Sequence, residues 1–202
     1  MVDGNDRGIK KIRMIFIARI VFAIVILFEL LNGFGVLRVP LDFSWFGLII
    51  TSGVAWASIE LLFGKAGNEK KLRIALPIAV MAVLLDMAGD VFRLYSRIIW
   101  YDRALHVIGG AVVAYLVYVL AERALSVLRP SMQVWFVVGV TSLLGTAYEV
   151  EEWLEDAWVH GKMLRLGNGP DVADDMLMNI IGAGIVMASI VLYEARKKKH
   201  EK

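Results

Sequence analysis

Long apolar runs alternate with short polar segments along the whole chain. A membrane-spanning helix needs about 20 predominantly apolar residues. Runs of that length fall at about residues 14–34, 44–63, 74–93, 102–121, 133–153 and 171–193. Backbone polar groups must be satisfied inside the hydrocarbon layer, so each run is expected to be helical. The pattern predicts an all-α, polytopic membrane helical bundle with six transmembrane helices, forming a single membrane domain over residues 1–202.

The composition agrees with this pattern and narrows the chemistry. Hydrophobic residues make up 58% of the chain, and the mean hydropathy is +0.65, above the range usual for soluble domains. The net charge is only +2, which argues against nucleic-acid binding. The chain has no Cys, so disulfides and thiolate metal ligands are excluded. The first apolar run is too long for the apolar part of a cleaved signal peptide.

Basic residues are unevenly distributed between the two sides of the predicted bundle. They gather in the N-terminal arm, the loop 64–73, the loop after the fourth run, and the tail that begins at Arg196. Fewer lie in the loops on the opposite side. Because Lys and Arg are enriched in cytoplasmic loops, this asymmetry predicts that both termini are cytoplasmic. The aromatic segment 95–101 is expected at the membrane interface.

Polar residues inside the apolar runs are not scattered. Asp171, Asp175 and Asn179 are spaced four residues apart, so they line one face of a helix. Three other helices carry pairs that also share a face: Asp86 with Asp90, Asp102 with His106, and Glu149 with Glu152. With a rise of about 1.5 Å per residue, all lie within about 12 Å of the outer boundary. The pattern predicts that they converge in one outward-facing polar cavity.

Such a cavity favours a bound cation. Each unpaired charge in hydrocarbon would cost several kcal/mol, and clustered carboxylates cannot all stay ionised without a counter-charge. One imidazole among carboxylates suits a divalent metal cation, with Mg²⁺ or Mn²⁺ favoured over Zn²⁺ or Fe²⁺. Shared protons are the alternative. The predicted metal ligands are His106, Glu149, Glu152, Asp171, Asp175, Asp86 and Asp90. His106 and Glu152 are also the predicted proton-transfer residues, supported by Asp102, Asn179, Arg93 and Arg103.

Several of these residues also have ordinary structural explanations. Asp171 follows Pro170 and fits a helix N-cap, and Asp174 fits the first turn beside the helix dipole. Asp90 is spaced for an i, i+3 ion pair with Arg93, and Asp102 is expected to pair with Arg103 or with another arginine at the interface. Two other acidic residues are expected to pair with Arg19 or to lie at the membrane interface: Glu29 and Glu60. Three more are expected to be solvated: Glu151, Glu155 and Asp156. His160 and His200 are expected to be ordinary loop and tail residues.

Three ordered motifs resemble a known family over about residues 74 to 193. The run Tyr101–Gly110 is similar to the Asp-x-x-x-His-x-x-Gly-Gly helix of the YjdF-like family of uncharacterised bacterial and archaeal membrane proteins. Tyr148–Trp153 resembles its Glu-rich motif, and Asp171–Gly182 its third motif. The same order is more distantly similar to VanZ-like proteins. The resemblance implies a shared membrane bundle in the prokaryotic plasma (inner) membrane, and it implies no particular reaction.

Three functions fit the predicted cavity. The first is a metal-dependent enzyme, a hydrolase or phosphotransferase, that acts on a lipid or lipid-linked phosphate. The second is a cation- or proton-coupled transporter or ion-binding protein, and the third is a non-catalytic scaffold. Membrane lipids are the expected partners, and binding of nucleic acid is not expected. The sequence leaves the formation of an oligomer open. Small residues allow close helix contacts, which are expected at Gly109, Gly110, Gly182 and Gly184.

Overall fold

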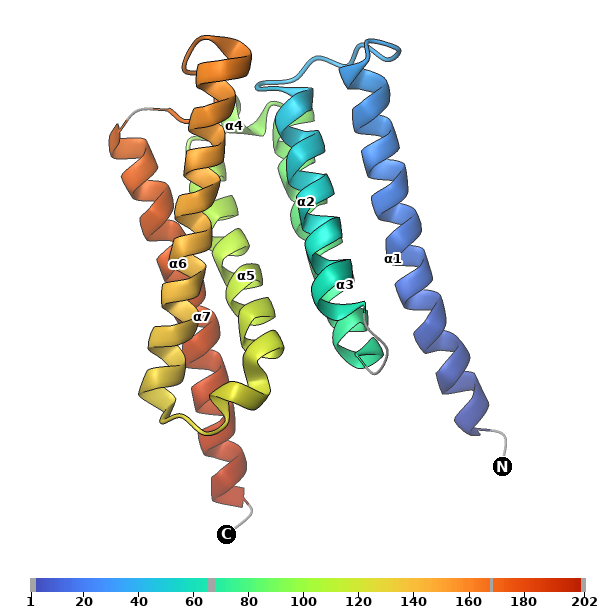
Figure 1. Ribbon diagram of the computed structural model, residues 1–202, viewed down its shortest axis with the longest axis vertical. Coiled ribbons are helices and arrows are strands. Elements are labelled where there is room, and N and C mark those ends of the chain that lie inside the picture. Colours follow the sequence, from blue (N-terminus) through green and yellow to red (C-terminus); the bar gives the residue numbers. More distant parts are fainter. Residues whose placement is uncertain (1–2, 65–67, 168, 201–202) are drawn as a thin grey trace. The chain divides into compact units, whose positions relative to one another are not determined.

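Helices account for most of the described backbone (Figure 1). The computed structural model describes residues 3–64, 68–167 and 169–200. These residues form no β-strand. The helices are α1 Asp3–Gly33, α2 Trp45–Phe63, α3 Glu69–Val91, α4 Leu94–Arg97, α5 Tyr101–Leu125, α6 Pro130–Glu155, the π-helix η1 Asp156–His160, and α7 Gly169–His200. The all-α class is therefore confirmed, and each of the six predicted apolar runs is helical.

Five of these helices are long and apolar enough to cross a membrane: α1, α2, α3, α5 and α7. Helix α6 is not among them, although 26 residues would extend about 39 Å. Polar residues such as Gln133 and Thr141 lower its apolar character. A multi-pass membrane protein follows from these helices. The sixth span and the sidedness of the termini stay predictions.

The chain divides into two compact units, Met1–Ile98 and Ile99–Lys202. The first contains α1 to α4, and the second contains α5, α6, η1 and α7. The single-domain assignment stays a prediction, and each unit is described by itself.

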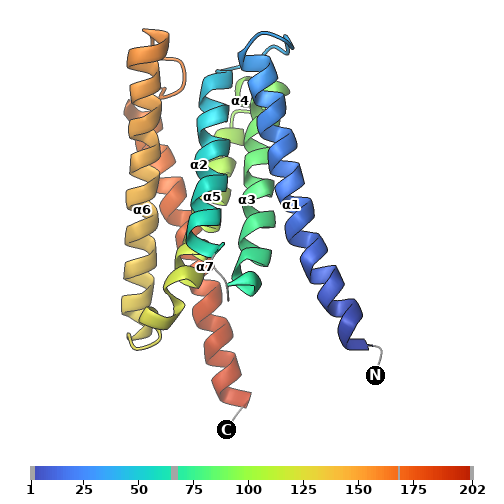
Figure 2. The same ribbon diagram turned by 45° about the vertical axis from the view of Figure 1, so that its right-hand side comes forward.

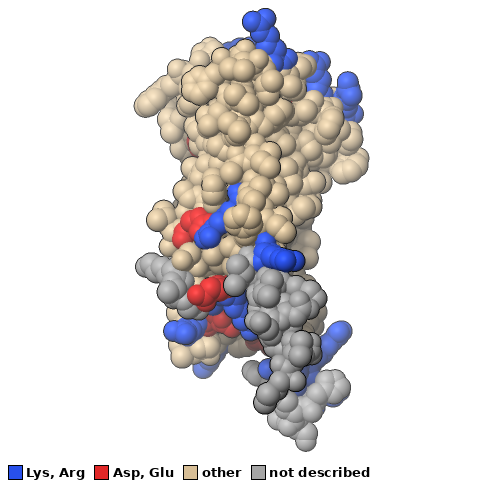
Figure 3. Space-filling model, turned by 90° about the vertical axis from the view of Figure 1, so that its right-hand side faces the viewer, with Lys and Arg blue, Asp and Glu red and all other residues tan. Residues whose placement is uncertain are grey.

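In the first unit, α1, α2 and α3 pack against one another (Figures 1 and 2). Phe22 stacks on Trp56 with ring centroids 5.7 Å apart. On the other side of α1, Phe16 and Ile24 are well exposed, as expected for side chains that face lipid. Figure 3 shows a broad zone without acidic or basic side chains on this face.

In the second unit, α6 runs antiparallel to both α5 and α7 (Figure 1). The start of α5, the end of α6 and the start of α7 therefore lie at the same end. Farther along the helices, an apolar core is built from Ala114, Val137, Ala183 and Met187. This core fixes the three helices, so the polar residues beyond it are held in a defined arrangement.

Candidate functional site

Two glycines let α5 and α7 approach closely enough for their polar side chains to meet. A Cβ atom at Gly110 would overlap the backbone of Asn179, and one at Gly182 would overlap the backbone of Val107. The predicted close contacts are therefore present at Gly110 and Gly182. They are wrong for Gly109 and Gly184, where an added Cβ would meet no described atom within 4 Å.

Asp102, His106 and Asp175 form the centre of the candidate site. His106 Nε2 lies 3.6 Å from Asp102 Oδ1 and 3.6 Å from Asp175 Oδ1. One ligand atom from each of the three residues lies within 4.8 Å of the others. Asp175 and His106 are nearly buried, with side chains 7% and 12% exposed, whereas Asp102 is 40% exposed. The group is therefore a half-enclosed set of two oxygen donors and one nitrogen donor.

The second ring nitrogen of His106 contacts Asn179, one turn beyond Asp175 on α7. Asn179 Nδ2 lies 3.2 Å from His106 Nδ1. An amide can present either its oxygen or its nitrogen to a neighbouring ring nitrogen. With the amide oxygen turned toward the ring, Nδ1–H donates to Asn179 and the Nε2 lone pair faces the two carboxylates. This arrangement has the form of a metal-binding histidine held by an outer partner.

Helix α6 contributes a buried carboxylate, Glu149. The residue is 2% exposed, and neither of its carboxylate oxygens has a hydrogen-bond partner among the described residues. The buried Oδ1 atom of Asp175 also lacks a hydrogen bond. A buried polar group without a partner costs free energy, and a charged one costs more. Glu149 and Asp175 therefore leave oxygen atoms available for a cation or for protons.

The acidic residues at the start of α7 lie at the rim of the site. Arg103 pairs with Asp174, and the pairing of Asp102 with Arg103 stays a prediction. Helix α7 begins at Gly169, so Asp171 lies in its first turn and is not the predicted N-cap. An acidic residue in the first turn is still favoured by the helix dipole.

Glu152 belongs to a second polar network, built around Arg165. Its Oε1 atom lies 3.1 Å from Arg165 Nη2. The same guanidinium group contacts Glu155 Oε2 at 2.5 Å and the Tyr148 hydroxyl at 2.9 Å, and Glu151 lies 3.4 Å away. Glu152 was predicted to be a ligand and proton-transfer residue, but here its charge is balanced by a buried arginine.

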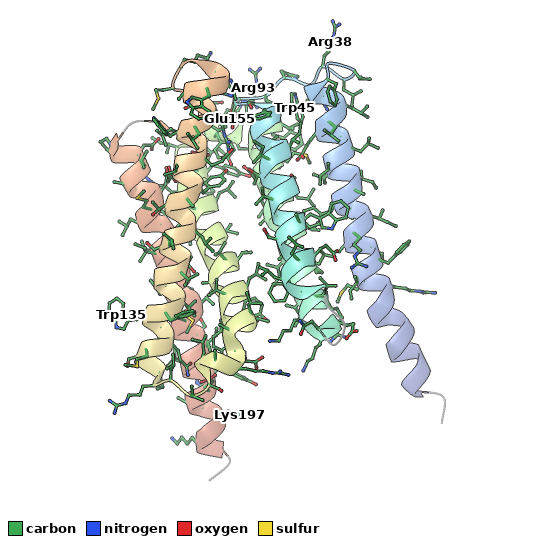
Figure 4. All side chains as sticks on the ribbon, in the orientation of Figure 1. Arg38, Trp45, Arg93, Trp135, Glu155 and Lys197 are labelled. Carbon is green, nitrogen blue, oxygen red and sulfur yellow. The ribbon has the colours of Figure 1, made fainter. Side chains whose placement is uncertain are left out.

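The loop that carries Arg165 is anchored by Asp156. This side chain is fully buried and accepts backbone hydrogen bonds from residues 164 to 166. Gly161 and Gly167 adopt left-handed backbone angles, with φ of 63° and 70°, at the two ends of the returning segment. The prediction that Glu155 and Asp156 are solvated is therefore wrong (Glu155 is labelled in Figure 4).

The environment of Arg165 is strongly acidic. Burial by itself lowers the pKa of Arg165, but the surrounding acidic groups outweigh it and raise the pKa above its usual value.

His160 was expected to be an ordinary loop residue, but its Nε2 atom lies 2.8 Å from Glu155 Oε1. The side chain of His200 lies outside the described residues.

Tyr148 connects the two networks. Its ring lies edge-on to His106, with centroids 6.4 Å apart, and the Arg165 guanidinium lies 5.8 Å from the Tyr148 ring centroid. Sequence reasoning missed both Arg165 and Tyr148. The Glu-rich motif contains a signal for the role of Tyr148, because Tyr148 and Glu152 are four residues apart and share a helix face.

The other two predicted ligands, Asp86 and Asp90, lie on α3 in the first unit. Asp86 accepts a hydrogen bond of 2.6 Å from the Tyr95 hydroxyl. Asp90 accepts one of 2.7 Å from the backbone N–H of Phe43. Arg93 lies 4.0 Å from Asp42, in place of the predicted pair with Asp90. Both carboxylates thus have structural roles in their own unit, and their assignment as metal ligands stays a prediction.

Comparison with known proteins gives a family for the chain. Residues 20–196 match the family described as predicted membrane protein (DUF2238). No curated protein and no solved structure matches the chain. The YjdF-like assignment and the likeness to VanZ-like proteins gain no support from these comparisons. The match covers most of the sequence, including all of the candidate site, so the chain belongs to the DUF2238 family of predicted membrane proteins.

Proposed function

We propose that this protein binds a divalent metal cation at Asp102, His106 and Asp175 and is an enzyme that acts on a phosphate-bearing lipid. The observation that carries the proposal is the convergence of these three donors beside buried carboxylate oxygens that have no hydrogen-bond partner in the described part of the chain. Two carboxylates and a neutral imidazole together carry two negative charges, which a divalent cation balances. The oxygen-rich donor set favours Mg²⁺ or Mn²⁺, with Zn²⁺ or Fe²⁺ as less suited ions.

The position of the donors supports a lipid phosphate as the substrate. Asp102 is the second residue of α5, and Asp175 is the seventh residue of α7. At about 1.5 Å per residue, the donors lie within about 10 Å of the helix ends. That depth corresponds to the boundary between hydrocarbon and headgroups. In the six-span arrangement with cytoplasmic termini, in a prokaryotic plasma membrane, this end of the second unit faces outward.

Each residue of the proposed site has a separate role. A bound divalent cation polarises a phosphoryl oxygen and balances its charge. Asp102 and Asp175 hold the cation, and Asn179 fixes the orientation of His106. We assign proton transfer to Glu149 rather than to Glu152, since Glu149 is buried without a hydrogen-bond partner whereas Arg165 balances Glu152. Its buried carboxylate is suited to accept a proton from an attacking water.

Elemental analysis joined to a turnover assay tests this function. Purified protein should retain on the order of one divalent cation per chain and release inorganic phosphate from a polyprenyl diphosphate or from phosphatidic acid. Asp175→Asn should lose both properties. Asp174→Asn is the matched control, because it removes the same charge from a rim residue that pairs with Arg103. A parent protein without metal, or an Asp175→Asn variant with full turnover, would refute the proposal.

The two alternatives make different demands on the site. A scaffold predicts that the buried carboxylates are paired, which fits Glu152 with Arg165 but leaves Glu149 and Asp175 unexplained. A cation transporter is favoured by the burial of Glu149, because buried carboxylates also relay protons and cations. Flux of Mn²⁺ into proteoliposomes, without phosphate release from either lipid, would identify transport instead.

A further inference from the structure

A fully buried carboxylate in the first unit lies far along α1 from its N-terminus. Glu29 is 0% exposed. Its Oε1 atom accepts a hydrogen bond of 2.8 Å from the hydroxyl of Ser52 on α2, a residue that is itself 1% exposed. The other oxygen, Oε2, has no hydrogen-bond partner among the described residues. The carboxylate is thus held between two helices with one oxygen unsatisfied.

The nearby arginine on α1 does not balance this carboxylate. Arg19 donates from Nε and Nη2 to the two carboxylate oxygens of Glu60, at 2.7 Å each. The expected partner of Glu60 is therefore confirmed, whereas Glu29 is not paired with Arg19. Ser52 supplies the one hydrogen bond that Glu29 receives from a described side chain.

The surroundings of Glu29 favour a hard cation. Carboxylate and hydroxyl oxygens are the ligands that hard cations prefer. An ionised carboxylate with a single hydrogen bond would otherwise cost several kcal/mol in an apolar interior.

We propose that Glu29 and Ser52 bind a monovalent metal cation of the Na⁺ type, in competition with a proton. One carboxylate balances a single positive charge, which favours a monovalent over a divalent ion. Glu29 lies four residues before the end of α1 at Gly33, about 6 Å along the helix. The path from the membrane boundary is therefore short. This site is separate from the triad of the second unit and does not depend on the function proposed for it.

Labelling with dicyclohexylcarbodiimide tests the proposal on the purified full-length chain in detergent. This apolar reagent reacts with protonated carboxyl groups in apolar surroundings, whereas a bound metal cation keeps the carboxylate ionised. Labelling of Glu29, read by peptide mass spectrometry, should slow about tenfold when Na⁺ exceeds its dissociation constant about tenfold. Choline chloride at equal ionic strength should give no protection, and LiCl and KCl report the selectivity.

Two variants make the result specific. Ser52→Ala should still be labelled at Glu29 but should need a higher Na⁺ concentration for protection. Glu60→Gln is the matched control, because it removes a carboxylate that Arg19 already balances, and its protection should equal that of the parent. Equal labelling rates in NaCl, LiCl, KCl and choline chloride would show a proton-only group and overturn the proposal. Absence of Glu29 labelling at every pH would overturn it too, since a cation site must exchange with solvent.

Discussion

Asn179 on α7 holds the ring of His106 on α5 through a contact of 3.2 Å between Nδ2 and Nδ1. When the amide oxygen faces the ring, this contact fixes the tautomer whose Nε2 lone pair can bind a cation. We predict that Asn179→Leu lowers the affinity for Mn²⁺ by about 10- to 100-fold, as is typical when an outer partner of a metal ligand is lost. Titration with Mn²⁺ measures the dissociation constant.

Asn179→Asp is the control for that variant. An aspartate also accepts a hydrogen bond from Nδ1–H. This variant should therefore bind Mn²⁺ about as tightly as the parent does, and more tightly than Asn179→Leu does. If all three proteins share one dissociation constant, Asn179 has no part in binding.

Close packing of α5 and α7 gives a second prediction. Gly182→Ala should lower the melting temperature in detergent, because the new Cβ would overlap the Val107 backbone. Overpacking of this kind costs about 1–3 kcal/mol. Gly184→Ala lies on the same helix, where the added Cβ would meet no described atom within 4 Å, and it should leave the melting temperature unchanged. Equal stability of the two variants would contradict the close contact.

The Arg165 network gives a third prediction. Arg165→Met removes the buried cation and leaves Glu152 and Glu155 without their counter-charge. Breaking a buried ion pair costs about 3–5 kcal/mol, so the variant should melt at a clearly lower temperature. Lys162→Met is the control, because Lys162 lies in the same loop and is exposed. A variant as stable as the parent would mean that these two glutamates are solvated in solution.

The sidedness of the second unit gives a fourth prediction. Lys162 precedes α7, and Lys199 lies in its last turn, beyond the stretch Gly169–Lys197 that is long and apolar enough to span a membrane. Reporter fusions at these two residues should report opposite sides, with Lys199 in the cytoplasm, as the distribution of basic residues predicts. If both reporters are cytoplasmic, α7 does not span the membrane and the site does not face outward.

The helices and half of the site could be predicted from the sequence. Apolar runs specify membrane helices directly, and four-residue spacing puts Asp102 with His106, and Asp175 with Asn179, on shared helix faces. The pairing of those two faces also follows from the small residues Gly110 and Gly182, which permit close approach. Burial of Asp175 and the contact between Asn179 and His106 agree with that prediction.

The remaining residues could not be assigned from periodicity. Depth along a helix gives the level of a side chain but not its lateral neighbours, so the grouping of Asp86 and Asp90 with the residues of the second unit rests on depth alone and stays a prediction. Arg165 lies in a loop whose return depends on Gly161, Gly167 and the backbone bonds of Asp156. Helical spacing carries no information about such a loop, so the partner of Glu152 was missed.

Pulsed electron paramagnetic resonance of Mn²⁺ bound to the full-length protein tests the central claim most directly. Coupling to a nitrogen nucleus identifies a histidine ligand, and the chain has three candidates, His106, His160 and His200. The site at Asp102, His106 and Asp175 predicts nitrogen coupling in the parent and in His160→Gln, and its loss in His106→Gln. A parent spectrum without nitrogen coupling, or coupling that persists in His106→Gln, would contradict the account.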